Sequence, residues 1–292
     1  MKIGVIGLGN MGVPMARNLV LAGYEVRGFD IVSPCPKDIK AAKSAVELST
    51  LSDVVIMMLP SGSIVKEVAD EILPNMAKGS ILLDCSTIDV ESTRLVAETA
   101  TNYGVLMADA PVSGGVSGAV AGTLTFMVGG SAEAFSTLKP LFDIMGQKAV
   151  HCGDSGNGQA AKICNNMILG ATMIVTCEAF ALADKLGLDR EKMYDVVSTS
   201  SGYSWSMNAY CPAPDIGPIS PADNDYKPGF SADLMLKDLR LSQQAAKTVD
   251  ADTPLGMHAT SLYKTFVEIE DGQGKDFSAM LPRFSKKTRT DT

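Results

Sequence analysis

The N-terminal segment IGVIGLGNMG constrains the fold more than any other part of the sequence. Gly7, Gly9 and Gly12 are spaced as G-x-G-x-x-G, directly after the apolar run KIGVI and at the start of an apolar helix-like segment. Glycines at this spacing form a tight turn from a strand into a helix, whose free N–H groups can face an anion. The segment predicts a pyrophosphate-binding turn formed by Gly7, Leu8, Gly9, Asn10, Met11 and Gly12. The alternative is that the glycines only form a tight strand-to-helix turn and bind no pyrophosphate.

Asp30 follows the next apolar run, EVRGF. A carboxylate there can accept hydrogen bonds from the adenosine ribose of a dinucleotide, and it would repel a 2′-phosphate. No arginine that could hold such a phosphate occurs among Ile31, Val32 and Ser33. The pattern therefore favours NAD over NADP, although Arg27 is close enough in sequence to affect this preference.

Short apolar runs alternate with helix-like segments through the first half of the chain. The runs are KIGVIG, EVRGFD, SDVVIMML, SILLDCS, GVLMADAP, LTFMVGG and KAVHCG. This alternation predicts a Rossmann-like, doubly wound α/β domain with a mainly parallel sheet, and beyond Gly158 only helical periodicity remains. We expect an NAD-binding domain at 1–160 and an all-helical substrate and dimerisation domain at 161–292, linked by a long helix from about 160 to 187.

Residues 200–230 fit neither pattern. Five prolines oppose a long helix here, while Tyr203, Trp205, Tyr210 and Tyr226 supply bulk that a flexible linker seldom has. Long loops in compact proteins are often functional. We therefore expect an ordered loop near a site, and frayed residues at 285–292.

Composition narrows the class of ligand. The formal net charge of -8 disfavours nucleic acid, and six cysteines without a CxxC pair beside two histidines predict neither a metal site nor disulfides. The uncharged run 163–177 is too short and polar for a bilayer span, and the chain starts directly in a strand. We expect a cytoplasmic protein with a small-molecule ligand.

The segment DAPVSGGVSGAVAGTLTFMVGG begins where a strand is expected to end. Ligands bind at this edge of open α/β sheets. Ser113, Gly114 and Gly115 offer a hydroxyl and accessible N–H groups, which can hold a substrate carboxylate. A flexible loop is the alternative.

The segment GQAAKICNNMILG places Lys162, Asn165 and Asn166 at helical spacing on one face. A lysine whose pKa falls towards neutrality can exchange a proton with a hydroxyl, and the two amides can bind that hydroxyl and hold the ammonium. The alternatives are a surface lysine and a structural partner for a carbonyl.

Four motifs together resemble those of the β-hydroxyacid dehydrogenases, in the same order: GLGNMG, DAPVSGGVSGAVAGTLTFMVGG, GQAAKICNNMILG and FSADLMLKDLRLS. The resemblance spans nearly the whole chain. It implies that Lys162 is the catalytic general acid/base, with Asn166 beside the reacting oxygen. It implies substrate contacts for Ser113, Gly114, Trp205, Phe230 and Asp238, and cofactor contacts for Leu59, Pro60, Thr87 and Lys237. One departure is Ile64, where members often carry a polar residue.

Within that family, PVSGGVSGAVAGTLTFMVGG and SSGYSWS most resemble the members that act on 3-hydroxyisobutyrate. The likeness implies NAD-dependent oxidation of this 3-hydroxy acid to methylmalonate semialdehyde in valine catabolism, by a homodimer or homotetramer. Reduction of tartronate semialdehyde, or of succinic semialdehyde or glyoxylate, is the alternative within the family. A noncatalytic dinucleotide-binding module is the alternative from another class.

Overall fold

The structure is a computed structural model that describes residues 1–286. The expected fraying at 285–292 falls mostly on residues outside this range. The chain divides into two compact units, Met1–Lys162 and Ile163–Thr292, compared with the predicted boundary between 160 and 161. The functional roles assigned to the two domains remain predictions.

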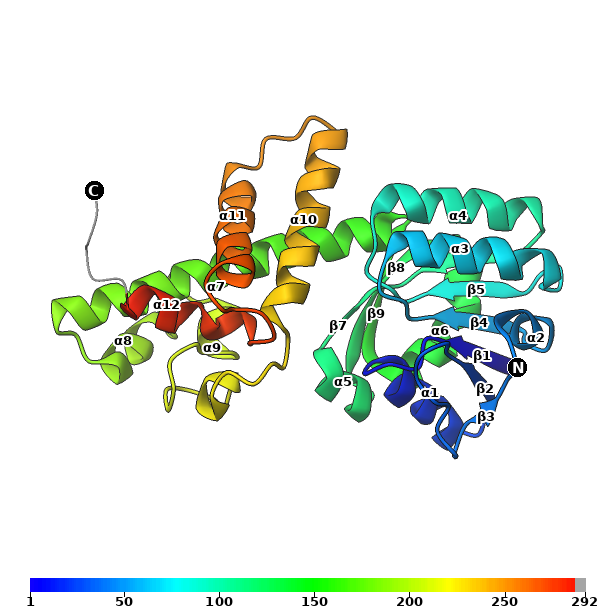
Figure 1. Ribbon diagram of the computed structural model, residues 1–292, viewed down its shortest axis with the longest axis horizontal. Helices are drawn as coiled ribbons and strands as arrows, with labels where there is room; N and C mark the ends of the chain where they lie inside the picture. The colour runs from blue at the N-terminus through cyan, green and yellow to red at the C-terminus, as the bar shows by residue number, and fades with distance from the viewer. Residues whose placement is uncertain (287–292) are drawn as a thin grey trace. The chain divides into compact units, whose positions relative to one another are not determined.

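Unit 1 is built on one sheet, and the structure describes the whole of this unit (Figure 1). Its strands are β1 (Lys2–Ile6), β2 (Glu25–Phe29), β3 (Lys40–Ala41), β4 (Val54–Met57), β5 (Ile81–Asp84), β6 (Leu106–Asp109), β7 (Val112–Ser113), β8 (Leu124–Gly130) and β9 (Gly146–Gly153). The first six run parallel in the order β3-β2-β1-β4-β5-β6, which is a doubly wound arrangement. Strand β8 is antiparallel to β6 and β7 and parallel to β9.

Helices cover both faces of this sheet (Figure 1). They are α1 (Gly12–Leu21), α2 (Ala45–Thr50), α3 (Gly62–Ile72), the short 3-10 helix η1 (Leu73–Asn75), α4 (Val90–Asn102), α5 (Gly115–Ala121) and α6 (Ala132–Met145). Ser61, Asp89 and Ser131 begin α3, α4 and α6, and each side chain accepts a backbone N–H from the first turn. These caps satisfy N–H groups that a helix leaves unpaired at its start.

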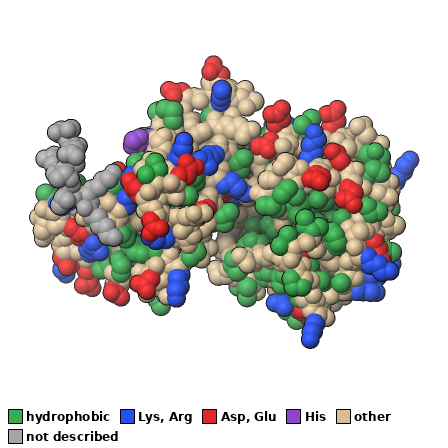
Figure 2. Space-filling model, in the orientation of Figure 1, with side chains coloured by type: hydrophobic (Ala, Val, Ile, Leu, Met, Phe, Trp, Pro, Cys, Tyr) green, Lys and Arg blue, Asp and Glu red, His purple; other side chains and the backbone are tan. Residues whose placement is uncertain are grey.

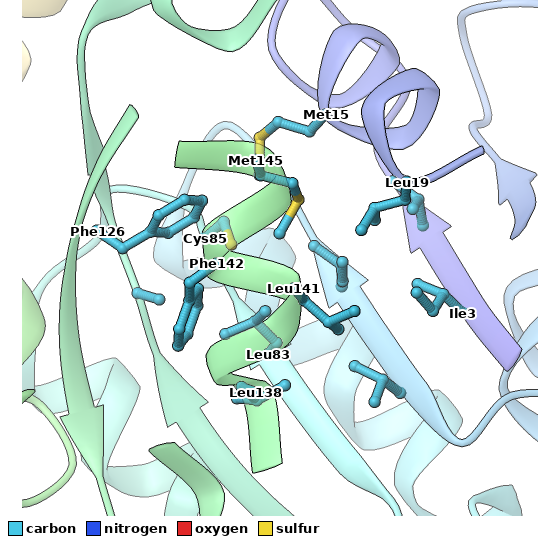
Figure 3. Close-up of a cluster of buried hydrophobic side chains, with 14 of the residues drawn as sticks. Ile3, Met15, Leu19, Leu83, Cys85, Phe126, Leu138, Leu141, Phe142 and Met145 are labelled. Atoms are coloured by element: carbon cyan, nitrogen blue, oxygen red, sulfur yellow. The ribbon is translucent and has the colours of Figure 1, made fainter. Parts of the chain in front are cut away.

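Two apolar clusters hold the helices to the sheet. One joins the strands to α1, α5 and α6, and the other joins them to α2, α3 and α4. In the first cluster Phe126 of β8 packs against Phe142 of α6, with ring centroids 4.9 Å apart (Figure 3). Both rings are almost completely buried, so this contact fixes α6 on its strand.

Unit 2 is mostly helical in its described residues, with one isolated β-bridge between Ser231 and Asp276. It contains α7 (Asn157–Leu186, which begins in unit 1), α8 (Arg190–Val197), α9 (Trp205–Asn208), η2 (Pro221–Asn224), α10 (Ala232–Thr248), α11 (Pro254–Glu268), η3 (Phe277–Ala279) and α12 (Met280–Lys286). Its core gathers α7, α10 and α11 around Phe180, Leu239 and Tyr263. Gly170 permits the close approach of α10, because a Cβ there would lie 3.0 Å from the Met235 sulfur.

The predicted fold class is confirmed, and all seven apolar runs contain strands. The two-residue strands β3 and β7 were missed, because two residues carry no periodicity. Residues 200–230 contain the short helices α9 and η2, which fit between the prolines.

Helix α7 contains the uncharged run 163–177. It has 30 residues and, with a mean hydropathy of 1.6 over an 18-residue window, it is long and apolar enough to cross a membrane. The expectation that the run 163–177 cannot span a bilayer concerned that run alone, and the helix extends beyond it at both ends. Half of that window is buried, however, and the core helix of a soluble protein passes the same test.

Replacing Phe126 with alanine tests the importance of its packing. Phe126→Ala should lower the free energy of unfolding by about 3 to 5 kcal/mol, since it leaves a cavity beside Phe142. Urea denaturation measures this loss. Tyr103→Ala, at a ring that is 43% exposed, is the matched control and should cost about 1 kcal/mol or less. Equal losses in the two variants would contradict the assigned importance of the Phe126 contact.

Candidate active site

Most of the residues predicted to contact the cofactor lie at one edge of the sheet. The segment Gly7–Gly12 follows β1, Leu59 and Pro60 follow β4, and Thr87 follows β5. Because these strands are parallel and adjacent, their carboxyl ends share an edge. Leu59 N donates to the Ser86 hydroxyl at 2.8 Å, which ties the segments after β4 and β5 together.

The three glycines of the first turn differ in the space around them. A Cβ at Gly7 would lie 2.2 Å from the Met58 carbonyl oxygen, and one at Gly12 would lie 1.9 Å from the carbonyl oxygen of Gly7. The fold therefore excludes side chains at both positions. A Cβ at Gly9 would meet nothing within 4 Å. This open space at the start of α1 is where the anion of a dinucleotide is expected, so the turn fits that group.

Asp30 lies directly after β2 and organises this turn. Its carboxylate accepts the backbone N–H groups of Leu8 at 2.7 Å, Val32 at 2.7 Å and Ser33 at 2.8 Å. Burial alone would raise the pKa of Asp30, but these three bonds lower it below its ordinary value. Asp30 is therefore ionised at neutral pH, and a carboxylate has acceptor capacity beyond three bonds. The stability it supplies is lost only as the pH falls through that lowered pKa.

Arg27, which complicated the cofactor prediction, forms an ion pair with Glu25. Its Nη2 lies 3.1 Å from Glu25 Oε1.

Exposed Lys and Arg side chains are interspersed with acidic ones on the face that Figure 2 shows. This distribution matches the negative net charge and lacks the basic footprint of nucleic-acid binding on that face.

The start of α7 is held by a buried carboxylate at the end of β6. Asp109 Oδ1 accepts the N–H of Gly156 at 2.7 Å, and Oδ2 accepts the N–H of Gln159 at 2.9 Å. The side chain of Asp109 has no solvent exposure. Desolvation by burial raises its pKa, even though its backbone hydrogen bonds oppose that shift.

Two glycines make room for this carboxylate. A Cβ at Gly129 would lie 2.5 Å from Asp109 Oδ1, and one at Gly158 would lie 2.7 Å from Oδ2 and 2.3 Å from the Met127 carbonyl oxygen. Real Cβ atoms do not approach so closely. Gly129 in β8 and Gly158 in the first turn of α7 thus leave room for the Asp109 carboxylate.

Gln159 adds a second tie from the same turn. Its Nε2 donates to the Ser86 carbonyl at 2.8 Å, and its Oε1 accepts the N–H of Ile88 at 3.1 Å. Gln159 is fully buried. Helix α7 is therefore fixed both to β6 and to the segment after β5 that contains Thr87.

Lys162 lies in the second turn of this anchored helix. It is 7% exposed, and its Nζ donates to the Val112 carbonyl at 2.8 Å. Val112 directly precedes Ser113, Gly114 and Gly115. The structure thus brings the predicted general acid/base to the predicted carboxylate site. A hydrogen bond to a carbonyl also fits the alternative that Lys162 is only a structural partner for that carbonyl. The catalytic role of Lys162 therefore remains a prediction.

The Ser-Gly-Gly segment requires its glycines. Gly114 has φ +131° and Gly115 has φ +62°, values that other residues adopt only with strain. Gly114 is the residue before α5, so the segment forms a strand-to-helix turn. Such turns can bind an anion.

In unit 2, three predicted residues form one hydrogen-bonded chain. Asn165 Nδ2 donates to Asn166 Oδ1 at 2.9 Å, and Asn166 Nδ2 donates to Asp238 Oδ2 at 2.5 Å. Asn166 and Asp238 are buried. Asn165 is thus linked to Asp238 through Asn166, and the predicted substrate contacts of both amides remain predictions. Lys237 precedes Asp238 on α10.

The two aromatic residues that are predicted to contact the substrate are also in unit 2. Trp205 is 52% exposed and stacks on Tyr210, and Phe230 packs edge-on against Phe277.

Sequence reasoning assigned no role to Asp109 or Gln159. An acidic residue at the end of a buried strand was a usable signal for Asp109, whereas nothing in the sequence reveals the partners of Gln159. Among the described residues, no cluster of His, Cys, Asp and Glu could hold a metal ion.

Comparison with known proteins matches both units. Residues 2–153 match the family model of the NAD binding domain of 6-phosphogluconate dehydrogenase. Residues 156–284 match the model described as NAD-binding of NADP-dependent 3-hydroxyisobutyrate dehydrogenase. Fold, glycine turn and matches together define an NAD(P)-binding oxidoreductase.

Individual relatives extend over nearly the whole chain. The 3-hydroxyisobutyrate dehydrogenase of Pseudomonas aeruginosa is 45% identical, covering 98% of this chain and 99% of its own. The NAD-dependent L-serine dehydrogenase of the same species is 43% identical and covers 97% of each chain. A solved structure of Mycobacterium tuberculosis 3-hydroxyisobutyrate dehydrogenase with L-serine superposes with a TM-score of 0.92 at 44% identity, covering 97% of this chain and 98% of that one. The chain belongs to the 3-hydroxyisobutyrate dehydrogenase family.

The Gln159 tie can be tested by a substitution that preserves bulk. Gln159→Leu should lower the free energy of unfolding by at least about 2 kcal/mol, because two buried backbone groups lose their partners. Urea denaturation measures the loss. Gln147→Leu, at an exposed position of β9, should change stability by about 0.5 kcal/mol or less. If Gln159→Leu proved equally mild, Gln159 would not anchor the helix.

Proposed function

We propose that this chain oxidises 3-hydroxyisobutyrate to methylmalonate semialdehyde with NAD, the reaction of valine catabolism that the sequence motifs imply. The observation that carries the proposal is the contact between the Lys162 ammonium and the Val112 carbonyl, directly before Ser113. It gathers a proton-transfer group and an anion-binding turn within one unit. Family membership and the glycine turn support the cofactor class.

Lys162 acts as the general base for oxidation. Its amine accepts the proton of the substrate hydroxyl while the carbon that bears this hydroxyl loses a hydride. In the reverse direction its ammonium returns the proton. Bound NAD supplies the hydride acceptor. Asn166 follows one turn later on α7 and can bind the reacting oxygen through its amide. Its hydrogen bond to Asp238 fixes the orientation of that amide.

The turn at Ser113, Gly114 and Gly115 binds the substrate carboxylate through its hydroxyl and N–H groups. Trp205, Phe230 and Asp238 contact the rest of the substrate, and Lys237 contacts the cofactor. These roles rest on the family motifs. The homodimeric or homotetrameric state and the cytoplasmic location also remain predictions.

L-serine is the second candidate substrate. One relative is an NAD-dependent L-serine dehydrogenase, and one solved relative is described together with L-serine. Serine carries an ammonium group where 3-hydroxyisobutyrate carries a methyl group. We favour 3-hydroxyisobutyrate because of the motifs PVSGGVSGAVAGTLTFMVGG and SSGYSWS. Reduction of tartronate semialdehyde, or of succinic semialdehyde or glyoxylate, remains an alternative, and steady-state kinetics over these substrates decides between them.

Lys162→Ala tests the catalytic assignment. We expect kcat to fall by about 10²- to 10⁴-fold, the contribution of a general acid/base, with the Kd for NAD nearly unchanged. Steady-state kinetics and cofactor fluorescence titration measure the two quantities. Lys148→Ala, on the exposed side of β9, should leave both unchanged. A kcat within a few fold of wild type would disprove the role of Lys162 and favour the structural alternative.

Asp30→Asn tests the cofactor preference. The wild type should show a higher kcat/KM with NAD than with NADP, since the Asp30 carboxylate repels a 2′-phosphate. The neutral variant should reduce this preference by about tenfold or more, because like-charge contacts cost several kcal/mol. Asp38→Asn, at an exposed carboxylate paired with Arg17, should leave it unchanged. A wild type that prefers NADP would contradict the proposal.

A further inference from the structure

A buried carboxylate in unit 2 collects more hydrogen bonds than a core position requires. Asp276 has no solvent exposure. Its Oδ2 accepts the Tyr210 hydroxyl at 2.8 Å and the N–H groups of Gly229 at 3.0 Å and Phe230 at 3.1 Å. Its Oδ1 accepts the N–H of Ser278 at 2.9 Å and the Ser278 hydroxyl at 2.6 Å.

These donors come from distant parts of the chain. Tyr210 lies just after α9, and Gly229 and Phe230 lead into α10. The Asp276 N–H in turn donates to the Tyr226 carbonyl at 2.9 Å. Asp276 therefore ties down the aromatic and proline-rich segment 200–230 at two places.

The same bonds position the two predicted substrate-contacting rings. Trp205 stacks on Tyr210 with centroids 4.8 Å apart and planes 22° from parallel. Phe230 meets the Phe277 ring edge-on at 5.7 Å, and Tyr210 packs on Phe277 at 5.3 Å. Trp205 is half exposed, so its stacking on Tyr210 holds a ring that solvent can reach.

A carboxylate suits this position and an amide does not. Five donors converge on its two oxygens, and an amide has only one oxygen to offer, with an NH₂ group that would face donors. Burial, together with the charge and hydrogen bond of Asp276, raises the pKa of Tyr210. The Tyr210 hydroxyl therefore stays neutral and donates.

We propose that Asp276 is a positioning residue that sets selectivity for the group on C2 of the hydroxy acid, by fixing Trp205 through Tyr210 and Phe230 through its backbone. The inference rests on the proposed function, which assigns Trp205 and Phe230 to the substrate. Loosening these rings weakens apolar discrimination at C2 and leaves the proton transfer by Lys162 intact.

Three acids that differ only at C2 test this: 3-hydroxyisobutyrate with a methyl group, 3-hydroxypropionate with hydrogen and L-serine with an ammonium group. A methyl group in an apolar pocket changes kcat/KM by about 10- to 200-fold. Asp276→Asn should reduce the wild-type ratio of kcat/KM between the first two acids by about fivefold or more. The change should lie mainly in KM, with the Kd for NAD unchanged.

Ser278→Ala is the matched control. It removes a hydroxyl bond from the other oxygen of the same carboxylate, so it should lower Tm and leave the ratio unchanged. Tyr210→Phe keeps the ring but deletes its bond to Asp276, and it should lower the ratio less than Asp276→Asn does. It carries the test if Asp276→Asn fails to fold.

The outcomes separate the two proposals. A wild type that prefers L-serine overturns the proposed substrate, while the variants still test Asp276 through their effect on the ratios between acids. Ratios within twofold of wild type in both Asp276→Asn and Tyr210→Phe overturn the role of Asp276. An equal change in Ser278→Ala also overturns it, because general destabilisation would then explain the effect.

Discussion

The hydrogen bonds from the start of helix α7 to the buried Asp109 carboxylate are the constraint on which the rest of the site in unit 1 depends. A helix leaves its first N–H groups unpaired and carries partial positive charge there. Asp109 satisfies two N–H groups of this segment from the end of β6. Since β6 also leads towards Ser113, one strand fixes both the helix with Lys162 and the predicted carboxylate turn.

This arrangement accounts for several features that seem unrelated in the sequence. Gly129 and Gly158 lack side chains because the carboxylate occupies that space. Gln159 extends the same attachment to the segment after β5, where Thr87 lies. The parallel order β1-β4-β5-β6 then places the glycine turn, Leu59, Thr87 and Ser113 along one sheet edge. The glycine turn and the lysine predicted to transfer the proton thus share one rigid support.

The sequence predicted what depends on local pattern. Apolar alternation located seven strands, and glycine spacing located the turn between β1 and α1, because both signals lie within about ten neighbouring residues. The sequence did not reveal pairings between distant residues, such as Asp109 with Gly156 or Asp276 with Tyr210. Their partners depend on the tertiary fold. The hydrogen bond between the Asn165 and Asn166 amides is a further contact that the sequence did not reveal.

The five prolines of segment 200–230 act on the unfolded chain as well as on the folded one. Proline holds φ near -65°, so an unfolded segment rich in proline has fewer conformations to lose. At about 0.4 to 1 kcal/mol for each compatible proline, five of them reduce the entropic cost of ordering the segment by about 2 to 5 kcal/mol. The aromatic loop that Asp276 ties down is therefore partly preorganised by its own covalent structure.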